Sequence, residues 1–151
     1  MTEAQWIRSH VERLLQAEWD TCRVIEDDDG DYPFRGETSA CWVSIVDSTP
    51  VMVRVFAHAA HGIKPSAKVY AELNDIQSRA LSAAVSWSGG VVLVTQTISP
   101  IGLTQPVLAQ AMRAVMGVAD DVGTLIASSF GGSTPYQAQI TTDEEVGGGT
   151  T

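Results

Sequence analysis

The sequence predicts an α+β fold, a two-layer sandwich in which helices flank one antiparallel sheet. Three segments carry apolar residues at helical spacing, and five short segments alternate apolar with polar residues, in the order α-β-β-β-α-β-β-α. A chain of 151 residues with 44% hydrophobic residues suggests one domain with a real core, which we place at residues 1–131. Residues 132–151 have few apolar anchors and are expected to form a mostly disordered tail, with contacts only at Tyr136 and Ile140.

The first predicted helix covers residues 2–19. Thr2 is a suitable N-cap and Glu3 suits the positive end of the helix. Its apolar stripe consists of Ile7, Val11, Leu14, Leu15 and Trp19. A short strand is expected over 21–26, and an Asp-rich turn follows it and extends through Tyr32-Pro33.

Two hairpins supply the rest of the predicted sheet. Segments 38–46 and 51–59 alternate, and the Asp47-Ser48-Thr49-Pro50 turn joins them as an antiparallel pair. Segments 83–87 and 91–98 pair around Ser88-Gly89-Gly90, a good signal for a short hairpin turn. Between the hairpins, a helix over residues 67–79 with Ser66 as its cap is predicted.

The last predicted helix runs from about residue 103 to 130. Pro106 lies in its first turn, where the missing N–H costs nothing, and Gly131-Gly132 ends it. Its apolar residues form two rows, which is more than one stripe facing a sheet. We therefore expect this helix to pack on a second body, either the 2–19 helix or another copy of the chain. Gly117 and Gly123 weaken the helix and would permit a kink or a close approach.

Composition limits the classes of partner. With 18 acidic and 9 basic residues the net charge is −9, which argues against nucleic acid or an anionic membrane as the main partner. No apolar run approaches the ~20 residues of a membrane span, and the N-terminus does not resemble a signal peptide. A cytoplasmic location is therefore expected. Cys22 and Cys41 are too few for a disulfide framework and are expected to be buried thiols.

The candidate chemical groups do not form a catalytic or metal-binding pattern. Asp27, Asp29 and Asp31 have the spacing of a calcium loop, but Tyr32 stands where its glycine should be. His58 and His61 form a possible pair, but a metal site needs three or four ligands. No nucleophile motif is present. We therefore expect no catalytic residues, no metal and no cofactor.

Large and adaptable apolar side chains are the remaining functional candidates. Core packing is the simpler interpretation for each of the four tryptophans, and the alternative is that some of them anchor a peptide or another subunit. Methionine suits either role. The candidate partner-binding residues are Trp6, Trp42, Met52, Arg54, Phe56, Trp87, Met112 and Met116.

Several local patterns occur in a characteristic order. These are Asp29-Gly30-Asp31, Val51-Met52-Val53-Arg54-Val55, Leu73-Asn74-Asp75-Ile76, Gly90-Val91-Val92-Leu93-Val94 and Gly102-Leu103-Thr104. Over residues 3–130 the ordered set resembles the type III secretion chaperone-like fold, and within it the YbjN-type family of putative bacterial sensory regulators and peptide-binding chaperones. Gln77 is a departure, since that position often carries Asn in the family. The resemblance implies a small, cofactor-free and often dimeric protein that holds segments of other proteins.

The sequence and the resemblance together favour a non-enzymatic module that binds a client peptide or protein as a homodimer. Its acidic rims would favour basic clients. One alternative is a structural or regulatory dimer without a client, in which self-association uses all of the surplus apolar surface. The other is an enzyme or small-molecule sensor, which would need a closed pocket with convergent polar groups.

Overall fold

The computed structural model of the chain describes residues 1–138. The predicted order of elements is confirmed, and the five strands form one antiparallel sheet in the order β1-β2-β3-β5-β4. The elements are α1 (Glu3–Glu18), β1 (Tyr32–Arg35), β2 (Ala40–Val46), β3 (Met52–Ala60), α2 (Ala67–Arg79), β4 (Ala84–Ser88), β5 (Val91–Ile98) and α3 (Gln105–Phe130).

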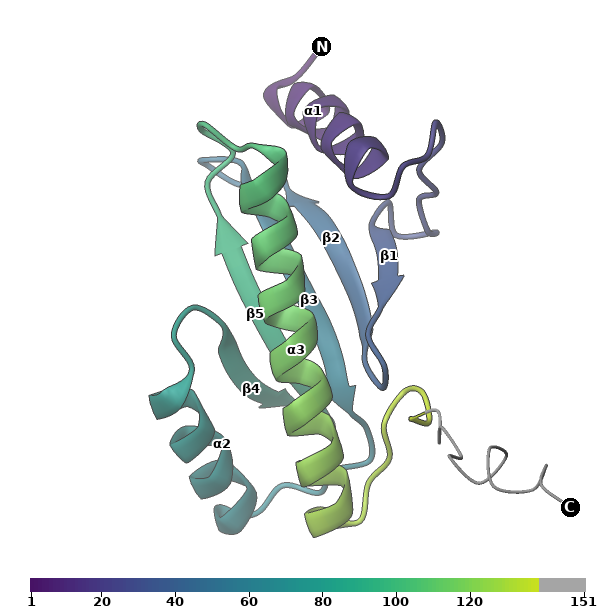
Figure 1. Cartoon of the computed structure of the whole chain (residues 1–151). Coiled ribbons are helices and arrows are strands. Elements are labelled where there is room, and N and C mark those ends of the chain that lie inside the picture. The colour runs from purple at the N-terminus through teal and green to yellow at the C-terminus, as the bar shows by residue number, and fades with distance from the viewer. Residues whose placement is uncertain (139–151) are drawn as a thin grey trace, which may run out of the picture.

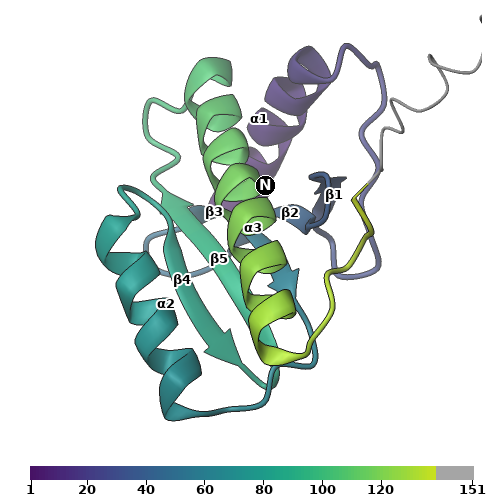
Figure 2. The ribbon, with the colours of Figure 1, turned by 60° about the horizontal axis from the view of Figure 1, so that its bottom comes forward.

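All three helices lie on one side of the sheet (Figures 1 and 2). The long helix α3 crosses β3 and β5, α1 packs on α3 and β2, and α2 packs beside β4. The alternating residues of the strands that face these helices form the core. They include Cys41 and Val43 of β2, Val53 and Val55 of β3, and Val92 and Val94 of β5.

The predicted first strand is wrong. Residues 21–26 form no strand, and β1 instead begins at Tyr32, within the segment that was predicted to be part of the turn. Pro33 is tolerated because β1 is an edge strand that pairs only with β2, through Pro33 opposite Trp42. Since the chain before it runs along the surface, Cys22 is exposed, and the prediction of a buried thiol holds only for Cys41.

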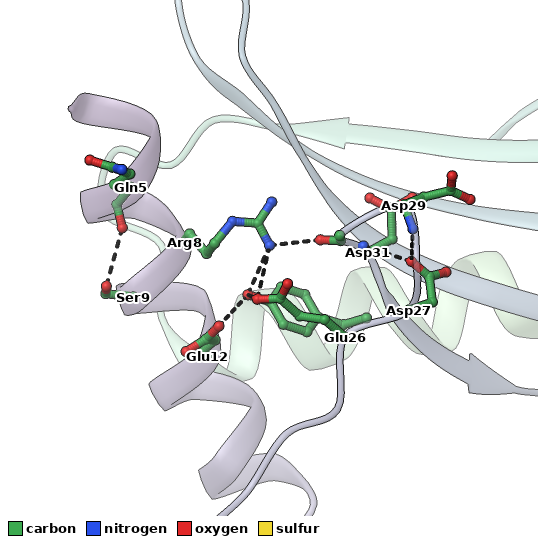
Figure 3. Close-up of polar contacts among 10 residues, drawn as sticks. Gln5, Arg8, Ser9, Glu12, Glu26, Asp27, Asp29 and Asp31 are labelled. Carbon is green, nitrogen blue, oxygen red and sulfur yellow. Dashed lines mark hydrogen bonds and ion pairs between the residues drawn. The ribbon is translucent and has the colours of Figure 1, made fainter. Parts of the chain in front are cut away.

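Tyr32 fixes β1 to α1, because its side chain is fully buried while its hydroxyl reaches a polar cluster. Figure 3 shows Arg8 and Glu12 of this cluster on α1, with Glu26 beside Arg8. The hydroxyl donates to Glu12 Oε1 at 2.6 Å and accepts from Arg8 Nη1 at 3.1 Å. Arg8 also donates to the Gly30 carbonyl and lies 3.5 Å from Glu26, so α1 holds the acidic turn as well. Burial, together with the bond to Glu12, raises the pKa of Tyr32 far above its usual value.

We expect Tyr32→Phe to destabilise the protein by about 2 kcal/mol, because the change removes the hydrogen bonds of the hydroxyl with Glu12 and Arg8 in a part-buried cluster. The shift in the midpoint of urea-induced unfolding measures this loss of stability. Tyr70→Phe is the matched control, since Tyr70 is 47% exposed and its hydroxyl forms no hydrogen bond within residues 1–138. Equal midpoints for the two variants would contradict the assigned role of the Tyr32 hydroxyl.

Helix α3 has the predicted ends, with Thr104 as N-cap, a proline in its first turn and Gly131 in the left-handed conformation after it. The second body predicted for this helix includes α1, which packs against it, and α2 also touches it. Some apolar surface stays uncovered: Val107 and Leu125 are 47% and 46% exposed. Of the two glycines, Gly123 permits a close approach, because a Cβ there would overlap the Ala59 carbonyl, whereas Gly117 faces open space.

The carboxylate of Asp120 on α3 holds the turn between β1 and β2. It accepts hydrogen bonds from the backbone N–H groups of Glu37, Thr38 and Ser39 at 3.0–3.1 Å and from the Ser39 hydroxyl at 2.7 Å. Thr38 and Ser39 are both buried. Burial alone would raise the pKa of Asp120, but these hydrogen bonds outweigh it and hold the pKa below its usual value.

The first residues of the predicted tail contact the domain. Ser133 forms an antiparallel bridge with His61, and the Tyr136 N–H donates to the Thr38 carbonyl. The Arg35 guanidinium lies 3.7 Å from the centre of the Tyr136 ring, a cation–π contact. Ile140 and the rest of the predicted disordered tail lie outside the described residues.

Gln77 of α2 has a specific structural role. Its Oε1 accepts a hydrogen bond from the Val85 N–H at 2.6 Å, and its Nε2 donates to the Ala83 carbonyl at 3.2 Å. Strand β4 is an edge of the sheet, so these backbone groups have no neighbouring strand on that side. The side-chain amide of Gln77 therefore makes the hydrogen bonds that a neighbouring strand would otherwise make with these two backbone groups.

Candidate functional site

No helix of the described residues covers the side of the sheet away from α1, α2 and α3, and we call this side the open sheet face. Its residues follow from the register, because directly paired residues point to the same side. The row at its centre consists of Pro33, Trp42, Phe56, Thr95 and Ala84, one from each strand. Four of the candidate partner-binding residues predicted from the sequence therefore lie on this face: Trp42, Met52, Arg54 and Phe56.

An aromatic cluster lies on this face. The Trp42 and Phe56 rings stack with their centroids 5.1 Å apart and their planes 18° from parallel. The centroid of the His58 ring lies 4.8 Å from that of the Trp42 ring and 5.4 Å from that of the His61 ring. Both Trp42 and Phe56 are only partly buried, although each packs against its neighbours. The cluster is thus a preformed and rigid apolar surface.

The environment of His58 disfavours its charged form. Burial, and secondly the proximity of His61, lowers the pKa of His58 below its usual value. Within residues 1–138 no group of three or more metal-ligating side chains comes together. The ring of His58 therefore extends the aromatic surface of Trp42 and Phe56.

Two tryptophans among the candidates lie elsewhere. Trp87 points to the helix side of β4, where its indole N–H donates to the Ile63 carbonyl at 2.8 Å and its ring meets that of Tyr70 edge-on. Core packing against the sheet accounts for it. Trp6 is 61% exposed on α1 and lines a shallow hollow with Pro100 and Ile101. The open sheet face includes neither residue.

The candidate methionines of α3 line a different surface. Met112 is buried, and Met116 is partly buried beside it. A groove of about 210 Å³ separates α3 from the end of α1 and from β1, and its apolar walls include Trp19, Phe34, Met112 and Met116. These methionines do not join the aromatic cluster, and their role in binding a partner stays a prediction.

The acidic loop that resembles a calcium site is held by hydrogen bonds between the Asp27 side chain and the backbone of the same loop. Asp27 Oδ1 accepts hydrogen bonds from the N–H groups of Asp29 at 3.0 Å and Asp31 at 2.9 Å. This is the arrangement of an Asx turn, in which the side chain serves the local fold.

The open sheet face has the features of a surface that binds by contact. It offers stacked aromatic rings, a neighbouring guanidinium and backbone that is already paired within the sheet, so affinity there would come from apolar contact and charge. Within residues 1–138 no helix is long and apolar enough to cross a membrane.

The arrangement of the sheet and helices places the chain in a known class, the α+β fold of type III secretion chaperones. A chain of the ExsC–ExsE complex has 14% identity and a TM-score of 0.62, covering 79% of this chain and 95% of its own. A chain of the HopA1–SchA chaperone–effector complex has 13% identity and a TM-score of 0.62, covering 80% and 96%. The Yersinia pestis structure of the chaperone SycH with a fragment of YscM2 has 12% identity and a TM-score of 0.55, covering 79% and 98%.

The chain belongs to the family described as "T3SS (YopN, CesT) and YbjN peptide-binding chaperone 1", whose model matches residues 5–138. The resemblance found in the sequence is therefore confirmed. No curated protein sequence matches the chain.

Proposed function

We propose that the chain is a non-enzymatic, cytoplasmic peptide-binding chaperone that acts as a homodimer and holds a client segment on its open sheet face. The observation that carries the proposal is the stacked pair of Trp42 and Phe56 on a side of the sheet that no helix covers. Membership of a peptide-binding chaperone family supports the same role.

A client side chain placed on these rings would lose most of its contact with water. Fully burying a large apolar side chain contributes about 1.5–3 kcal/mol, and aromatic anchors at the centre of an interface carry most of its affinity. The pair is preorganised by its own stacking, so little side-chain entropy is lost when a client binds.

We expect Trp42→Ala and Phe56→Ala each to weaken binding of an unfolded, reduced and alkylated test protein by about tenfold, measured by fluorescence anisotropy. The matched control is Trp6→Ala, which removes an exposed indole outside the open sheet face. Circular dichroism checks that each variant is folded. An equal loss for all three variants, or no loss for any, would rule out the open sheet face as the client site.

The apolar surface that stays exposed on α2 and α3 supports self-association. A groove of about 270 Å³ lies between the two helices. The half-exposed Leu125 lines it together with the buried Ile76 and Val122 and the charged Arg79 and Asp121. We expect light scattering to give the mass of a dimer, and Leu125→Glu to shift it to that of a monomer, because a buried unpaired carboxylate opposes association. A monomeric mass for the unmodified chain at all concentrations would reject the homodimer.

A further inference from the structure

We propose that the segment which occupies the open sheet face is apolar and acidic, with a carboxylate on Arg54 beside an apolar side chain on Trp42 and Phe56. This rests on the proposed function and specifies its client. It also reverses the expectation from the overall charge, which favoured basic clients.

The sheet excludes acidic residues. In the described part of the chain no strand contains Asp or Glu, although the protein has 18 acidic residues. The charged residues in the strands are Arg35 and Arg54, and both share a side with Trp42 according to the register. A basic segment on this face would meet guanidinium groups and no carboxylate of the strands.

Arg54 is available to a partner. Its neighbours in register are Ser44 and Thr97, which are both uncharged, and it forms no ion pair within residues 1–138. Arg35 is already engaged, since it donates to the carbonyls of Gly36 and Glu37 and stacks on Tyr136. Arg54 is therefore the cation of the open sheet face that is free to bind a carboxylate.

The densest acidic cluster of the chain lies outside the strands. The densest cluster, Glu26 to Asp31, is held against α1 through contacts of Arg8 with Glu26 and with the Gly30 carbonyl. Charges separated by more than a Debye length of about 8 Å are largely screened at physiological ionic strength. The net charge of −9 therefore does not describe the strands around Arg54, which contain no acidic residue in the described part of the chain.

The spacing on β3 defines a simple recognition pattern. Arg54 and Phe56 are two residues apart on one strand, so their side chains point the same way about 7 Å apart. An extended client chain has the same repeat. It can therefore place an apolar side chain on the Trp42–Phe56 pair and a carboxylate on Arg54 from positions i and i+2.

Two labelled peptides of identical length test the proposal. Both carry Phe at alternate positions of a Ser/Gly background. In one peptide Glu, and in the other Lys, lies two residues from a Phe. We expect the full-length protein to bind the Glu peptide about fivefold more tightly in fluorescence anisotropy, with the difference shrinking at high salt. Arg54→Gln should abolish the difference and Arg54→Glu should invert it.

Arg79→Gln is the matched control, because it removes an exposed arginine that pairs with Asp75 on α2. It should leave the preference unchanged. Equal binding of both peptides, or a preference for Lys, would overturn the inference while leaving the proposed function intact. Failure of both peptides and of the unfolded test protein to bind would instead reject the proposed function. A change of mass by light scattering in Arg54→Glu would show that a second copy occupies the face and would also overturn the inference.

Discussion

Gly123→Ala is expected to destabilise the protein by about 3 kcal/mol or more, the largest effect of any methyl addition on α3. The added Cβ would overlap the Ala59 carbonyl. Because the carbonyl is part of the backbone of β3, it cannot rotate away as a flexible side chain could. The helix must then move away from β3 and open the core along its length, and such overpacking typically costs 1–3 kcal/mol or more. Urea unfolding followed by circular dichroism measures the change.

Gly117→Ala is the matched control, because it makes the same change on the same helix where no atom lies within 4 Å of the new Cβ. Alanine has the better helix propensity, so this variant should be more stable by up to about 1 kcal/mol. Opposite signs for the two variants are the decisive result. Two stabilising changes would show that α3 does not approach the backbone of β3 at Gly123.

Asp120→Asn is expected to lower stability by about 2 kcal/mol at neutral pH, because an amide cannot accept every hydrogen bond that Glu37, Thr38 and Ser39 donate to the carboxylate. Hydrogen bonds to a charged group are worth about 1.5–3 kcal/mol each before solvent screening. Asp121→Asn is the control, since Asp121 is the exposed neighbour on α3. Equal midpoints for the two variants would contradict the role of Asp120.

The loss of stability in Asp120→Asn should depend on pH. The pKa of Asp120 is lower in the folded state than in the unfolded chain. Its contribution to stability is therefore fully present above the unfolded pKa, about 3.9, and is lost as the pH falls through the folded value. The gap in unfolding free energy between the unmodified protein and Asp120→Asn should narrow below about pH 4. A gap that is independent of pH would exclude the carboxylate as its source.

The sequence was informative wherever local chemistry decides the structure. Thr2 and Ser66 cap their helices through the bonds that their side chains accept, as predicted. Gly89 and Gly90 have positive φ in the turn of the second hairpin, as its composition indicated. The position of Trp42 opposite Phe56 follows from alternation together with hairpin pairing.

The features that the sequence did not reveal depend on contacts between distant segments. Tyr32-Pro33 has the composition of a turn, but it is a strand that pairs with β2 and is held by a bond from the buried tyrosine hydroxyl to Glu12, twenty residues earlier. Asp120 binds groups more than eighty residues away, and no local pattern marks it. Overall charge does not predict which charged residues lie on the open sheet face, because composition does not record which side of a sheet a residue occupies.

The amide of Gln77 has a consequence for how the protein behaves at high concentration. A sheet normally extends by adding a strand to an unpaired edge, and this is the route by which β proteins polymerise. At β4 the Val85 N–H and the Ala83 carbonyl are already occupied from within the same chain. Gln77 thus makes two backbone groups at this edge unavailable to an added strand, which disfavours growth of the sheet from β4.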